Sequence, residues 1–149
     1  MIFPYRLCAL CFLAMALAGC GPKLRLSASF HTEDRPAGSA HVVAEDLART
    51  LADVYPPGHT AIFLSQTGAP HDELGPALEA ALRVRGFTLA QEGEGSALTV
   101  AYVLDRFNDH AWFAKLAVSD GFTETRVYQA GEGGLEAQGA ARTGETRHE

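Results

Sequence analysis

Residues of the types used in catalysis and metal binding are present in this chain, but their spacing predicts no active site. Asp109-His110 and Ser119 supply the residue types of a catalytic triad, without a nucleophile elbow or oxyanion motif. The segment 131–134, Gly-Glu-Gly-Gly, is not followed by the Lys-Ser/Thr pair of a phosphate-binding loop. The histidines lack the spacing of metal ligands: His31, His41, His59, His71, His110 and His148. We therefore expect no catalytic residues, no metal site, no cofactor and no small-molecule substrate.

Cys20, near the N-terminus, stands where a cysteine could be modified covalently. Arg6 precedes an uncharged run from Leu7 to Ala18, which is the order of a secretory signal. The run is shorter than the roughly 20 apolar residues of a membrane-spanning helix. It ends in Leu17-Ala18-Gly19-Cys20, which looks like a bacterial lipobox, where a peptidase cuts before the cysteine and its sulfur is acylated. The alternative is an ordinary signal peptide with a chance cysteine at this position.

Cleavage before Cys20 would leave 130 of the 149 residues, with 11 basic and 18 acidic side chains. Cys8 and Cys11 leave with the signal, so no disulfide can form within one mature chain. Two or three long acyl chains, palmitate among them, would hold the protein on the membrane. Gly21 follows the cysteine in place of the Asp that typically retains lipoproteins at the inner membrane, which favours the periplasmic face of the outer membrane. The acidic charge argues against direct binding of nucleic acid.

The composition divides the chain into four parts. Residues 1–19 are the lipoprotein signal peptide, and residues 20–38 are a flexible tether that contains Pro and Gly. Alternate apolar residues from Leu24 to Phe30 leave open a short edge strand within this tether. Residues 39–130 are predicted to form a small domain. Residues 131–149 are rich in Gly and charge, so we expect a disordered tail.

Two helices are predicted within the domain. Val43, Leu47, Leu51 and Val54 recur at helical spacing, so a helix should run from about 40 to 55, with Ser39 as its N-cap and Glu45 paired with Arg49. Asp46 should face away from the apolar stripe. A second helix should open at residues 71–73 and end before Gly86.

Strands should occupy the remaining apolar segments. Residues 60–66 are predicted to form a strand covered on both faces, and residues 87–90 a short strand. Alternation at 97–107, 111–119 and 122–130 predicts an antiparallel meander, with a type I′ turn at Asp120-Gly121. The expected fold class is α+β. Two helices should pack on one face of a mixed, mostly antiparallel sheet of four to five strands that ends in this three-stranded meander.

Several segments resemble the TrbH family of conjugal-transfer lipoproteins. The segment 101–107, Ala-Tyr-Val-Leu-Asp-Arg-Phe, is similar to the surroundings of that family's Asp-x-Phe pair, and Arg126-x-Tyr128 is similar to its Arg-Ala-Tyr. The lipobox, the segment 44–48 and the sequence from Leu78 to Phe87 also fit. The resemblance covers residues 40–128, and the C-terminal end departs from the family pattern.

The resemblance implies an accessory or structural role in mating-pair formation, the type IV secretion machinery that moves DNA between bacteria. The implied partners are the membrane, through the anchor at Cys20, and other secretion-channel subunits. The rival hypothesis is a lipid-anchored periplasmic binding module for envelope assembly or lipid handling, and a periplasmic hydrolase is a further alternative. A deep apolar pocket would favour the binding module.

Four residues of the meander are candidates for partner binding. Asp105 and Phe107 are two apart and share one strand face, as do Arg126 and Tyr128. Aromatic residues and arginine often dominate the energy of interfaces. We expect these four to lie near one end of the sheet, on adjacent strands. A structural pair between Asp105 and Arg126, with Tyr128 in the core, is the competing interpretation.

Overall fold

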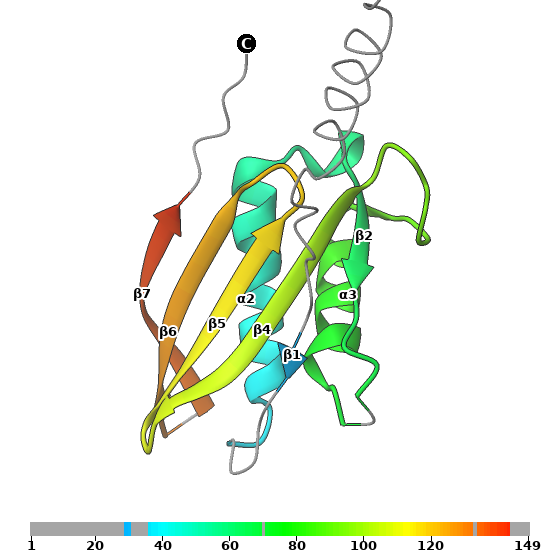
Figure 1. Ribbon diagram of the computed structural model, residues 1–149. Coiled ribbons are helices and arrows are strands. Elements are labelled where there is room, and N and C mark those ends of the chain that lie inside the picture. Colours follow the sequence, from blue (N-terminus) through cyan, green and yellow to red (C-terminus); the bar gives the residue numbers. More distant parts are fainter. Residues whose placement is uncertain (1–28, 31–35, 70, 133, 144–149) are drawn as a thin grey trace, which may run out of the picture.

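The computed structural model describes residues 29–30, 36–69, 71–132 and 134–143 (Figure 1). The predicted signal peptide, the motif Leu17-Ala18-Gly19-Cys20 and most of the predicted tether lie outside these residues. The described elements are β1 Ser29–Phe30, α2 Ser39–Val54, a 3-10 turn Pro57–His59, β2 Ala61–Ser65, α3 Leu74–Val84, β3 Thr88–Leu89, β4 Leu98–Asn108, β5 Ala111–Val118, β6 Thr123–Gly131 and β7 Gly134–Thr143.

Glycine and proline residues mark the ends of the two helices. Gly38 is the N-cap of α2 and adopts a left-handed φ of 77°, which a glycine tolerates best. Ser39 is therefore the first helical residue and not the predicted cap, and its hydroxyl donates to the carbonyl of Pro36. Pro56 and Pro57 follow the last turn of α2. Gly86, with a φ of 88°, follows α3 as predicted.

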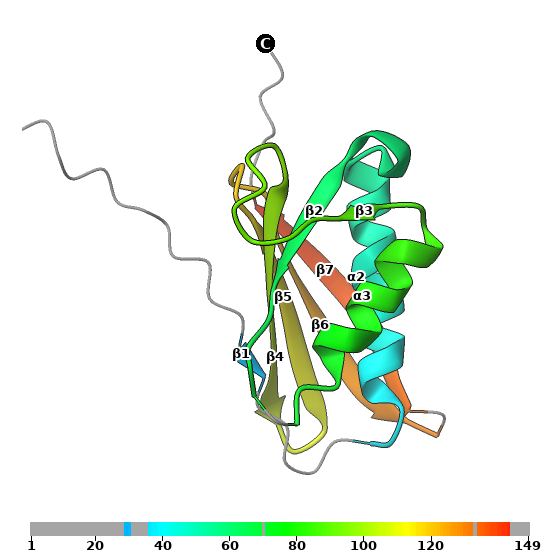
Figure 2. The same ribbon diagram turned by 90° about the vertical axis from the view of Figure 1, so that its right-hand side faces the viewer.

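The fold is α+β, with both helices on one face of a mixed sheet, as Figure 2 shows. The strand order is β3-β2-β4-β5-β6-β7. Strand β2 is parallel to both of its neighbours, β3 and β4, whereas each successive pair from β4 through β7 is antiparallel. The predicted meander is confirmed as β4, β5 and β6. The predicted count of four to five strands was too low. The turn after β5 holds three residues, with Gly121 at a φ of 104°, and not the expected two.

Strand β7 occupies part of the segment for which the sequence predicted disorder. Its ten residues, Gly134–Thr143, pair antiparallel with β6. Leu135 is 3% exposed and anchors the strand in the core. The prediction of a disordered tail was therefore wrong for residues 134–143, because backbone pairing with β6 compensates for a sequence with a single large apolar side chain. Residues 144–149 lie outside the described part of the chain.

Strand β1 is the short edge strand that the tether sequence left open. Ser29 and Phe30 pair in parallel with Val103 and Leu104 of β4. Strand β2 pairs with the earlier half of β4, from Leu98 to Ala101, so β1 continues the same side of the sheet. The chain therefore docks on its own sheet before α2 begins.

The core lies between the helices and one face of the sheet. Alternate residues Val100, Tyr102 and Leu104 of β4 are fully buried there. The residues that meet them include Val43, Leu47 and Leu51 of α2, Leu74, Leu78 and Leu82 of α3, and Trp112, Leu116 and Tyr128 of the meander. In β2, Ile62 and Leu64 are buried whereas Phe63 is partly exposed. The predicted coverage of this strand on both faces was therefore wrong, since the helices cover one side only.

Candidate functional site

Asp46 of α2 lies at the centre of a buried group of polar side chains. It is 5% exposed, and Arg126 of β6 donates to its carboxylate at 2.9 Å. The hydroxyl of Tyr128 donates to the same carboxylate oxygen at 2.9 Å, and Arg49 forms a further ion pair with Asp46. The prediction that Asp46 faces away from the core was wrong, because β6 covers this side of the helix.

A second buried carboxylate shares the same arginine. Glu124 is 1% exposed, accepts a hydrogen bond from the hydroxyl of Thr50 at 3.1 Å and pairs with Nε of Arg126. The planar guanidinium presents several donors at fixed angles, so one arginine can bridge Glu124 and Asp46. We call the six residues the α2–β6 cluster: Asp46, Arg49, Thr50, Glu124, Arg126 and Tyr128.

The electrostatics of the α2–β6 cluster keep its phenol neutral and its guanidinium charged. Burial raises the pKa of Tyr128, and the neighbouring charge of Asp46 raises it further. Burial alone would lower the pKa of Arg126, but its hydrogen bond to Glu124 and the charge of Asp46 outweigh burial, and the pKa is raised. Neither group changes its protonation near neutral pH, so both serve as fixed partners of the buried carboxylates.

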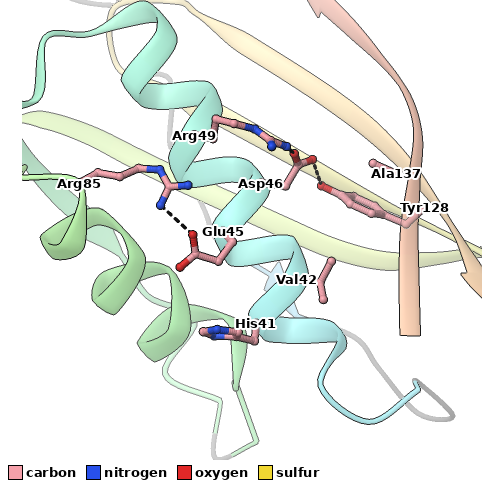
Figure 3. Close-up of a pocket in the computed structure, with 8 residues that line it drawn as sticks. All are labelled: His41, Val42, Glu45, Asp46, Arg49, Arg85, Tyr128 and Ala137. Carbon is pink, nitrogen blue, oxygen red and sulfur yellow. Dashed lines mark hydrogen bonds and ion pairs between the residues drawn. The ribbon is translucent and has the colours of Figure 1, made fainter. Parts of the chain in front are cut away.

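An open groove of about 410 Å³ runs beside this cluster along the exposed side of α2 (Figure 3). Its lining residues are His41, Val42, Glu45, Asp46, Arg49, Arg85, Tyr128 and Ala137. Arg85 donates to Glu45 at 2.7 Å, so the predicted pair of Glu45 with Arg49 was wrong. The open form and the charged lining do not provide the deep apolar pocket that a lipid-handling module needs.

The four predicted partner-binding residues are not brought together. Strand β5 lies between β4 and β6. Its residue Ala114 pairs with Leu104 of β4 on one side and with Arg126 of β6 on the other, so all three residues share one face of the sheet. Asp105, one residue beyond Leu104, therefore lies on the face of the sheet away from the helices. Phe107 is 67% exposed, whereas Tyr128 is fully buried. The expectation that Asp105 and Arg126 occupy adjacent strands was wrong, and Arg126 pairs with Asp46 and Glu124 instead.

The residue types of a catalytic triad are also separated. His110 precedes β5 and Ser119 follows it, so the whole of Ala111–Val118 lies between them. Asp109 pairs with Arg106 at 2.8 Å, and the hydroxyl of Ser119 accepts the backbone N–H of Thr99 at 3.0 Å. In the described part of the chain, no three His, Cys, Asp or Glu side chains gather in a way that could hold a metal ion.

The sequence contained a signal for the α2–β6 cluster that periodicity alone did not reveal. Glu124, Arg126 and Tyr128 alternate in phase with the buried Phe122, which places all of them on the helix-facing side of β6. An arginine on that side requires buried carboxylate partners, and the structure supplies Asp46 of the facing helix and Glu124 in place of the predicted Asp105. Among the described residues, no helix combines the length and hydropathy needed to cross a bilayer.

These observations define an α+β domain whose buried charges are paired with one another and not arranged around a reaction centre. Residues 26–145 match the family of the conjugal transfer protein TrbH, and the chain belongs to this family. The resemblance seen in the sequence is thereby confirmed, and the protein is a conjugal-transfer protein of an accessory family that is not a known family of enzymes. No curated protein and no solved structure matches the chain.

Proposed function

We propose that the chain is a lipid-anchored accessory subunit of a conjugative type IV secretion apparatus. It is held at the periplasmic face of the outer membrane by acyl chains on Cys20, and its domain contacts other subunits of the channel. Membership of the TrbH family supports the role in conjugation and the expectation of partners within the transfer system. The single observation that carries the anchor is the motif Leu17-Ala18-Gly19-Cys20 directly after an uncharged run.

The domain supports an assembly role more than a chemical one. Its buried ionic groups satisfy each other, and the groove beside α2 is open and charged. A subunit of this kind contributes a rigid shape and a surface to a larger complex. Its acidic balance is consistent with contact to protein subunits and not to the transferred DNA.

The anchor is tested by Cys20→Ser in donor cells that carry the complete transfer system. We expect loss of labelled palmitate, loss of the protein from the outer-membrane fraction of a density gradient, and a fall in transfer frequency. Cys11→Ser, within the uncharged run, is the matched control and should change none of the three. Continued incorporation of palmitate by the Cys20→Ser protein would show that the acyl chains are attached elsewhere.

A further inference from the structure

Strand β7 forms a long edge of the sheet that no other strand covers in the described part of the chain. It pairs with β6 on one side, and the strand order ends there. Residues 136–139 are exposed along its middle, on both faces of the sheet. Ten residues without a proline leave outward N–H and C=O groups available for backbone pairing, which is the arrangement that an added strand uses.

The groove beside α2 adjoins this edge. Ala137 of β7 and Val42 of α2 both line it, and Figure 3 shows these two residues on the same side of α2. Val42 is 40% exposed, one of few large apolar side chains left in solvent among the described residues. An additional strand beside β7 would direct alternate side chains toward α2, and one of them would cover Val42.

The charges of the groove and of the edge differ, and together they define the occupant. Within the groove, Asp46 and Glu45 are already paired with arginines, so an apolar side chain fits there without leaving a charge unpaired. At the start of β7, Glu132 and Glu136 are exposed. Residues 39–143 contain 14 acidic and 7 basic side chains, so the domain attracts a basic segment and repels a second acidic copy of itself.

We propose that the open edge of β7 binds an extended basic segment of a partner protein. The segment adds to the sheet as a further strand and places an apolar side chain in the groove beside Val42. This deepens the proposed function, on which it rests for the identity of the partner as a channel subunit, by assigning the surface that makes the contact.

The test uses the full chain in detergent and two fluorescent ten-residue peptides, one alternating Val with Lys and one alternating Val with Glu. We expect the Val-Lys peptide to bind at least about tenfold more tightly, because only its charge complements the edge. Its binding should slow hydrogen exchange of the β7 amides and leave those of β3 unchanged. Val42→Lys should weaken binding about tenfold, whereas Val84→Lys, an equal change of charge at an exposed position of α3, should weaken it less than about twofold.

Equal binding of the two peptides, absence of binding, unchanged exchange at β7, or equal losses in the two Lys variants would each overturn the inference. Self-association that Val42→Lys abolishes would assign the edge to a second copy and overturn it as well. Equal melting temperatures of the variants exclude misfolding as the cause. Failure here leaves the Cys20→Ser experiment unaffected, since labelling and localisation do not involve β7, so the inference and the proposed function are separable.

Discussion

Replacing Arg126 by Met should strongly destabilise the domain. Arg126 lies between two carboxylates, Asp46 and Glu124, that are 5% and 1% exposed. Breaking a buried pair by removing one partner costs about 3–5 kcal/mol of unfolding free energy. Asp46 keeps Arg49 and Tyr128, and Glu124 keeps Thr50, so we expect a value near the lower limit, about 3 kcal/mol. For a domain of this size, the melting temperature should fall by roughly 12–24 °C.

Circular dichroism during heating and urea titration measures this change. Arg83→Met is the matched control, because Arg83 is 59% exposed and pairs only with Glu79 across a turn of α3 among the contacts described. It should cost at most about 0.5 kcal/mol. Adding Glu124→Gln to Arg126→Met should restore part of the loss, since it removes a buried negative charge that has lost its arginine. An Arg126→Met protein as stable as the Arg83→Met protein would refute the reasoning that this arginine holds the buried carboxylates.

Three further predictions follow from individual contacts. Burial raises the pKa of Tyr55, Tyr102 and Tyr128, so their contribution to stability should be complete below about pH 10, the unfolded pKa, and decrease above it; tyrosinate absorbance should rise together with unfolding and not before it. Gly75→Ala should cost about 1–3 kcal/mol in urea titration, because its methyl group would collide with the hydroxyl of Tyr102, whereas Gly58→Ala has open space and should be neutral. His110→Ala should leave transfer frequency unchanged at equal protein abundance, and a large loss would indicate a chemical role.

The helices and the meander could be predicted because their signals are local. The apolar stripe of α2 and the alternation in β4 and β5 specify element type and the buried face. Strand β7 could not be predicted, since Leu135 is its one large apolar residue and its pairing partner is supplied by β6. Composition described the segment as a tail, and tertiary hydrogen bonding made it a strand.

The site was predicted in part. Arg126 and Tyr128 were correctly grouped as neighbours on one strand face, but the structural interpretation paired Arg126 with Asp105 and gave Tyr128 no acidic partner. The alternation pattern predicts which strands pair, but it does not give the orientation of α2 about its own axis. That orientation places Asp46 against β6, where Arg126 and Tyr128 bind it. A buried ion pair between a helix and a strand depends on packing between layers, which the periodicity of either element does not contain.

If Cys20 is anchored as proposed, the pairing of β1 with β4 limits how far the domain can lie from the membrane. With an anchor at Cys20, Ser29 lies nine positions further along the chain, and an extended chain of nine steps reaches about 30–32 Å. If the two-residue strand detaches, the free chain runs to Ser39 and its reach roughly doubles, to about 63–68 Å. Because β1 pairs with β4 through only two residues, this pairing stabilises the docked position weakly. An anchor at Cys20 would therefore give the domain two limits of reach from the lipid surface, a short one while β1 is paired with β4 and a long one once β1 is detached.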